Sequence, residues 1–161
     1  FYNNFIQNIL KGKKFELKAQ VNYLGRYNPR LNTGKDSFID WDMGSYELFN
    51  FINAFDDPYD GASTFLNNKK LGKLHLKKVH IHGGDSSNHP YMSGLVSRHD
   101  GKWIVVCTNS KHMLLVEEIL NNKGKNVIKD IKVGDRFYTP LKELVKLRKT
   151  RTRINSRGLK K

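Results

Sequence analysis

Residues 39–64 read IDWDMGSYELFNFINAFDDPYDGAST, an apolar helical pattern that runs into a cluster of carboxylates. Apolar side chains recur here at i, i+3, i+4 and i+7, at positions Leu48, Phe51, Ile52 and Phe55. This spacing predicts a helix with one apolar face. The helix must end before the proline of the DDPYDGA segment, because proline lacks an N–H group and disfavours helical geometry in the residue before it.

The short polar side chains of this stretch have two expected roles. Asp42 or Ser45 can cap the helix, because a short side-chain oxygen accepts a hydrogen bond from the N–H groups of the first turn. Asp56, Asp57 and Asp60 follow the helix and are candidates for a metal or acid–base site. We interpret them instead as a helix end and turn, in which a nearby Lys or Arg, or solvent, offsets the unfavourable helix dipole.

After Gly61 the hydrophobic period changes from helical to strand-like. Short apolar segments separated by turn residues predict strands at 62–66, 73–82, 94–99, 103–108 and 112–120, with a last short one around Phe137 and Tyr138. Asp100-Gly101 between two of them indicates a tight hairpin. Several short strands at this spacing favour a small OB-like barrel, closed or nearly closed. The fold class is therefore α+β and mainly β.

The two ends of the chain flank this barrel. Residues 1–10 have helical apolar spacing, and Gly12 is expected to end this helix. Residues 13–36 are rich in Gly, Pro and Asn, which predicts an extended linker with local turns. A final helix is expected from Pro140 or Leu141 onward, followed by a basic tail.

Composition narrows the class of protein. The chain has 161 residues with 38% hydrophobic residues, including nine Phe and seven Tyr, which is enough for a core. No apolar run approaches the ~20 residues that cross a bilayer, so we expect no membrane partner. Cys107 is the single cysteine and is expected as a small buried hydrophobe in a strand, which fits a cytoplasmic location.

The net charge of +14 indicates a polyanionic partner. Residues 142–161 contain nine Lys or Arg and one acidic residue, so +8 of the net charge lies in this segment. The candidate phosphate-binding residues are Lys146, Arg148, Lys149, Arg151, Arg153 and Arg157. Tyr91, Trp103 and Tyr138 are candidates for stacking on bases, although Trp103 is expected in the core. The alternative is a solvated tail without a ligand.

Histidines form a second cluster. His75, His80, His82 and His89 lie close together in sequence, and His80 and His82 would share one strand face. With Asp85 or His89 they suggest a metal site, but the pattern lacks cysteine and H-E-x-x-H. We expect that these histidines lie on a solvent-exposed strand face and bind no metal.

Four motifs occur in a fixed order: IDW at 39–41, FINA at 51–54, DPYDGA at 57–62 and SGLV at 93–96. They resemble I-D-W, F-I-R-A, D-P-Y-P-G-A and P-G-x-V in the C-terminal portion of folate-dependent formyltransferases, which include methionyl-tRNA formyltransferase and the sugar N-formyltransferases. The chain departs from this pattern at Asn53 and Asp60. Asn53 cannot replace the guanidinium of an arginine that pairs with a carboxylate or phosphate.

The resemblance implies transfer of a formyl group from 10-formyltetrahydrofolate to an amine. In that family the transfer uses an Asn, a His and an Asp of an N-terminal Rossmann-like domain, with the His inside a Pro-rich loop, and residues 1–161 contain no matching stretch. We therefore expect no catalytic residue and no cofactor in these residues, with the catalytic centre upstream of Phe1 or lost.

The predicted organisation of the chain has four parts. Residues 1–38 would be the end of a catalytic domain with its linker, 39–61 a joint, 62–140 the barrel and 141–161 a basic helix and tail. The favoured hypothesis is a methionyl-tRNA formyltransferase-like enzyme whose barrel adds a basic surface for initiator tRNA. An accessory domain of a sugar-nucleotide N-formyltransferase, or a stand-alone binding module, is the alternative.

Overall fold

The computed structural model describes residues 1–16, 18–19, 32–67, 69–84 and 87–149. The chain forms two compact units, one made of residues 1–29 and 153–161 and the other of residues 30–152. The second unit contains the barrel and the groove described below. None of the helices in the described residues is long and apolar enough to span a bilayer.

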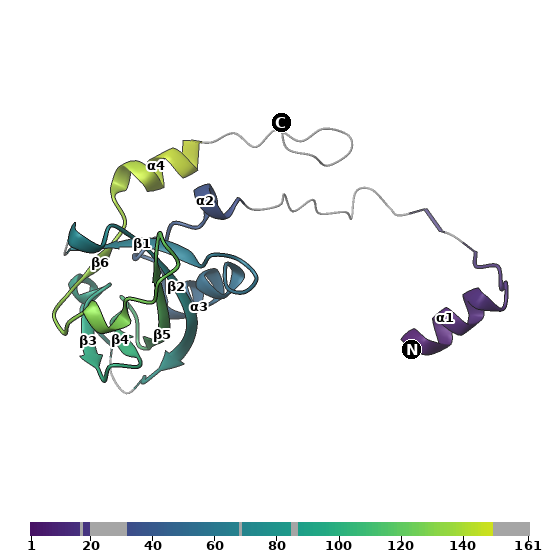
Figure 1. The fold of residues 1–161 in the computed structure, drawn as a ribbon, viewed down its shortest axis with the longest axis horizontal. Helices are drawn as coiled ribbons and strands as arrows, with labels where there is room; N and C mark the ends of the chain where they lie inside the picture. Colours follow the sequence, from purple (N-terminus) through teal and green to yellow (C-terminus); the bar gives the residue numbers. More distant parts are fainter. Residues whose placement is uncertain (17, 20–31, 68, 85–86, 150–161) are drawn as a thin grey trace. The chain divides into compact units, whose positions relative to one another are not determined.

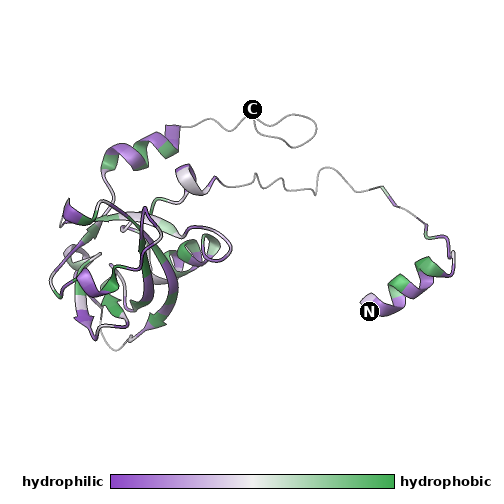
Figure 2. Ribbon diagram, in the orientation of Figure 1, coloured by the Kyte–Doolittle hydropathy of each residue, from purple (hydrophilic) through white to green (hydrophobic). Residues whose placement is uncertain are grey.

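The first unit contains one helix, α1, which spans Tyr2–Leu10 and confirms the prediction from its spacing. Gly12 follows its end with a φ of +71°, a left-handed conformation that glycine adopts without steric cost. Hydrophobic and hydrophilic residues alternate along the helix (Figure 2). The structure buries none of the α1 side chains.

The second unit is built around one curled, antiparallel six-stranded sheet (Figure 1). The strands follow the order β3-β4-β5-β2-β1-β6. Their bounds are Ala62–Leu66 (β1), Lys73–His82 (β2), Val96–His99 (β3), Ile104–Val106 (β4), Met113–Asn121 (β5) and Phe137–Tyr138 (β6). Single turns of 3-10 helix lie at Lys69–Leu71 (η2), Pro90–Met92 (η3) and Ile128–Asp130 (η4). The predicted strands and the hairpin at Asp100 are thus confirmed.

The two end strands of the sheet meet and close the barrel. Leu95, just before β3, forms an antiparallel bridge with Arg136, just before β6. The Phe137 N–H donates to the Gly94 carbonyl oxygen at 2.8 Å. Gly94 has a φ of +78°, and a Cβ added there would lie 2.3 Å from the Phe137 carbonyl oxygen. Only glycine permits this approach of the two backbones.

A sharp corner occurs in the two longest strands. Along β2, every second side chain is buried up to Leu76, and the next buried apolar side chain, Val79, comes three residues later, from the other face of the strand. On β5 the same change of buried face lies between Val116 and Ile119. Between Leu76 and Val79, Lys78 has a φ of +50°, which is unusual for a residue with a side chain. The change of face lets each strand bend and keep both of its halves facing the core.

The segment before the barrel supplies much of the core. Ile39 is fully buried, and its N–H donates to the Ser63 carbonyl oxygen at 2.9 Å. The Trp41 indole N–H donates to the Thr64 hydroxyl at 2.9 Å, and its ring stacks on Phe137 with centroids 5.7 Å apart. The IDW motif therefore joins β1 to the closing strand β6.

Helix α3 spans Ser45–Ala54 and buries the expected face, although its start differs from the prediction. Gly44 occupies the N-cap position, and its N–H donates to the Glu47 carboxylate at 2.9 Å. Ser45 is the first helical residue, and its N–H donates to the Ser110 hydroxyl at 2.9 Å. The prediction that Asp42 or Ser45 caps the helix was wrong, because a glutamate one turn into the helix binds the cap backbone instead.

Residues 33–38 pack onto the barrel in the described structure. Thr33–Asp36 form one helical turn, α2, where the sequence predicts an extended segment with local turns. Ser37 is fully buried and its hydroxyl lies 2.7 Å from that of Ser63. Phe38 pairs with Ser63 in a parallel bridge. This buried contact with β1 fixes the end of the segment, which composition alone does not reveal.

Candidate nucleic-acid interface

The candidate interface begins with α4, which spans Leu141–Lys149 and directly follows Pro140, as predicted. Three exposed lysines, Lys142, Lys146 and Lys149, recur at i, i+4 and i+7. This spacing places them on one face of the helix, and we call them the lysine stripe. Both hydrophilic and hydrophobic residues occur along α4 (Figure 2).

The basic residues predicted from the sequence fall into two groups. Lys146, Arg148 and Lys149 lie on α4, whereas Arg151, Arg153 and Arg157 lie outside the described residues. The Arg148 guanidinium pairs with the Asp40 carboxylate at 2.9 Å, so its charge is partly balanced within the domain. Lys142 was not among the predicted residues, although its helical spacing to Lys146 is a sufficient signal.

A groove of about 300 Å³ lies between the IDW segment, the η3 loop, β6 and the start of α4. The side chains that give it its chemistry are Asp40, Asp42, Tyr91, Arg136 and Tyr138. Tyr91 is 81% exposed and Tyr138 is 38% exposed. Two of the three predicted stacking residues therefore line one groove. The third, Trp103, is half-buried, and the Arg98 guanidinium lies 5.5 Å from its ring centroid.

Arg136 organises one wall of this groove. Its guanidinium donates to the Tyr91 carbonyl oxygen, and its backbone N–H donates to the Asn67 side chain at 3.1 Å. The ring of His89 stacks on that of Tyr91, with centroids 5.1 Å apart. The exposed tyrosine is therefore held by contacts to its backbone and to one side of its ring. Arg136 was not among the predicted site residues.

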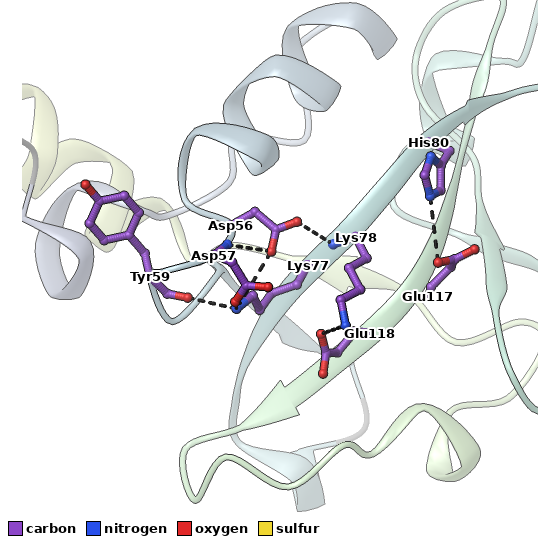
Figure 3. A network of polar contacts seen from close by, with 8 residues as sticks. All are labelled: Asp56, Asp57, Tyr59, Lys77, Lys78, His80, Glu117 and Glu118. Atoms are coloured by element: carbon purple, nitrogen blue, oxygen red, sulfur yellow. Dashed lines mark hydrogen bonds and ion pairs between the residues drawn. The ribbon is translucent and has the colours of Figure 1, made fainter.

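The aspartates after α3 bind the corner of β2 (Figure 3). The Asp56 carboxylate accepts the backbone N–H of Lys78 at 2.9 Å, which holds this residue at its positive φ. The buried Lys77 ammonium pairs with Asp57, lies 3.7 Å from Asp56, and donates to the Tyr59 carbonyl oxygen at 2.9 Å. Lys77 is thus the expected counter-charge, and these contacts support a structural joint.

Charge and burial act in opposite directions on this network. The hydrogen bond and charge of Lys77 hold the pKa of Asp57 below its ordinary value. Burial alone lowers the pKa of Lys77, but the contact with Asp57 and the charges of Asp56 and Glu118 outweigh it and raise that pKa. Both charged forms are therefore favoured in the folded state. Asp60 is exposed in the same turn.

The predicted histidine cluster is spread over several environments. His75 is half-buried, and its pKa is lowered chiefly by burial. His80 lies 3.7 Å from Glu117, which is the contact drawn at the upper right of Figure 3. Asp85, the suggested third ligand, lies outside the described residues. In the part of the chain that is described, no three His, Cys, Asp or Glu residues are arranged to hold a metal ion.

Cys107 behaves as the sequence predicts. Its side chain is 1% exposed directly after β4. Its backbone N–H donates to the Leu95 carbonyl oxygen at 2.8 Å, and its carbonyl oxygen accepts from Gly94 at 2.9 Å. The residue therefore belongs to the barrel closure and has no exposed thiol.

These features agree with a comparison against known protein families. The model of the family described as "Formyl transferase, C-terminal domain" matches residues 33–134. The match covers more than half of the chain, and the chain belongs to this family. It includes the IDW segment, the joint and five of the six strands, but ends before β6 and α4.

The structure gives physical reasons for the motifs that carry the resemblance. Ile39 and Trp41 anchor the incoming segment, and Gly61 lies where a Cβ would come within 2.9 Å of the Leu76 carbonyl oxygen. Gly94 permits barrel closure. Asn53, which replaces the expected arginine, is exposed on α3. The motifs thus mark places where the packing of this barrel restricts the choice of residue.

Proposed function

We propose that this domain is the RNA-binding C-terminal part of a methionyl-tRNA formyltransferase-like enzyme. Such an enzyme transfers a formyl group from 10-formyltetrahydrofolate to an amine. Membership of the formyltransferase family supports the general class. In this proposal the domain contributes positive surface for a tRNA, while the folate and the reacting groups belong to a catalytic domain.

The observation that carries the proposal is the lysine stripe on α4. Its three lysine residues are exposed on one helical face, in a chain with a net charge of +14. An ammonium that contacts a phosphate releases condensed counterions, so binding weakens as salt rises. Three such contacts give a slope of log K against log salt of about −2 to −3.

The test is the salt dependence of tRNA binding. We would measure retention of tRNA on filters by the full chain between about 50 and about 200 mM KCl. We expect replacement of Lys142, Lys146 and Lys149 by serine to weaken binding and to reduce the slope by about 1 per lysine. Serine is polar, so its side chain is compatible with these solvent-exposed positions.

A matched control separates a specific surface from net charge. Lys123, Lys125 and Lys129 are also exposed but lie in the β5–η4 region. Their replacement by serine removes the same charge and is expected to change the slope much less. Equal effects of the two triple variants would contradict the assignment of α4. Absence of tRNA retention at low salt, together with binding of a nucleotide sugar, would favour the sugar-nucleotide enzyme.

A further inference from the structure

We infer that the groove beside α4 binds one unstacked nucleotide of single-stranded RNA. Its base would stack on Tyr91 and Tyr138, its amino edge would meet Asp42, and its phosphate would meet Arg136. This inference rests on the proposed RNA-binding function and names the part of the RNA that the groove takes. All four residues line the same groove.

The size of the groove selects the ligand. Its volume is about 300 Å³, at the lower end of the range for small-molecule sites. This space suits one ring system with a sugar. A duplex keeps the faces of its bases inside the stack, so an unpaired nucleotide is the form that can place a base here.

Tyr91 is built as a stacking platform. Its ring is 81% exposed, yet His89 packs against it at 5.1 Å and Arg136 binds its backbone oxygen. An aromatic ring fixed in this way loses little conformational entropy when a base stacks on it. Tyr138 adds a second, half-exposed ring from β6 at the same groove.

The charges of the groove favour particular bases. Asp40 already accepts from Arg148 at 2.9 Å and from the Asp42 N–H at 3.2 Å, so its oxygens are engaged. Asp42 has an exposed carboxylate, which accepts N–H groups but repels carbonyl oxygens. Adenine, cytosine and guanine carry an exocyclic amino group, whereas uracil flanks its single N–H with two carbonyls. The groove should therefore prefer these three bases to uracil.

Arg136 provides the complementary cation. One of its five N–H groups is used by the Tyr91 carbonyl, and the planar guanidinium matches the geometry of a phosphate. The guanidinium and the tyrosine ring thus approach the ligand from the same wall. A nucleotide carries both an anionic phosphate and base N–H donors, which match the opposite charges of Arg136 and Asp42 in the lining of the groove.

The test uses the full chain and fluorescein-labelled hexanucleotides of adenine, cytosine or uracil, followed by fluorescence anisotropy. We expect the adenine and cytosine oligomers to bind more tightly than the uracil oligomer and than a short RNA duplex. Tyr91→Ala should raise the Kd for the adenine oligomer at least about fivefold, while Tyr91→Phe should leave this Kd unchanged. Asp42→Asn should reduce the preference over uracil.

Tyr46→Ala is the matched control, because Tyr46 is 58% exposed on α3 and does not line the groove. Equal effects of Tyr91→Ala and Tyr46→Ala, or absence of oligonucleotide binding while tRNA still binds through α4, would overturn this inference and leave the proposed function intact. Loss of both kinds of binding would overturn both. Oligonucleotide binding without tRNA binding would uphold the groove and contradict the tRNA proposal.

Discussion

Replacement of Gly94 by alanine should destabilise the barrel far more than the same change at Gly124. Both glycines have a positive φ, +78° and +73°, so both variants place an L-residue in a left-handed conformation. At Gly124 the new Cβ meets nothing within 4 Å, whereas at Gly94 it would lie 2.3 Å from the Phe137 carbonyl oxygen. The pair separates backbone strain from the close approach of two backbones.

The expected magnitudes follow from these contacts. Backbone strain costs about 1 kcal/mol at either position. At Gly94 the backbone must also move, which weakens its hydrogen bonds with Phe137 and Cys107, each worth about 1 kcal/mol. We therefore expect a loss of about 3 kcal/mol for Gly94→Ala and about 1 kcal/mol for Gly124→Ala.

Urea unfolding followed by circular dichroism gives the measurement. With a slope of about 2 kcal/mol per M, Gly94→Ala should lower the midpoint by about 1.5 M and Gly124→Ala by about 0.5 M. Similar midpoints for the two variants would refute the reasoning, because they would mean that β3 and β6 do not approach each other at Gly94.

Two further predictions concern the joint and the IDW motif. Because the pKa of Asp57 is lowered, the stability from its contact with Lys77 is present above the unfolded pKa of the carboxyl and is lost as pH falls through the folded value. Because the pKa of Lys77 is raised, its contribution is present below the unfolded pKa of the amine and is lost at alkaline pH. The variant Lys77→Met should therefore show a flatter dependence of unfolding free energy on pH below about 4, and an unchanged acid profile would contradict this role. Trp41→Phe should cost about 1 kcal/mol in urea unfolding because it removes the bond to Thr64, and an unaltered midpoint would count against that bond.

The sequence was sufficient to predict elements whose hydrophobic period is regular. Leu48 and Ile52 on α3, and Phe55 directly after it, have helical spacing and are buried, and the alternating segment at 73–82 is β2 with the same bounds. Asp100 forms the expected hairpin, in which its carboxylate accepts the N–H groups of Lys102 and Trp103. In these cases local spacing and tertiary burial favour the same structure.

Contacts between distant residues account for what the sequence did not reveal. The cap of α3 depends on Glu47 reaching back to Gly44, and Ser45 is engaged by Ser110 from another loop. The positive φ of Lys78 is stabilised by Asp56, more than 20 residues away in sequence. No local pattern specifies such pairs.

The candidate interface was predictable only in part. Lys146 and Lys149 were identified from charge, and Lys142 follows from the same helical spacing. The groove, by contrast, depends on barrel closure, which brings Arg136 to the Tyr91 backbone. The pairing of Arg148 with Asp40 also joins residues more than 100 positions apart and reduces the charge that composition suggests.

The binding surface can be mapped by titrating the ¹⁵N-labelled chain with tRNA and following its amide resonances by NMR. We predict that the largest shifts fall on Tyr91, Arg136, Tyr138 and the lysine stripe of α4, with little change at Lys123 and Lys125. Shifts concentrated on the β5–η4 region, or spectra that do not change with tRNA, would contradict this prediction.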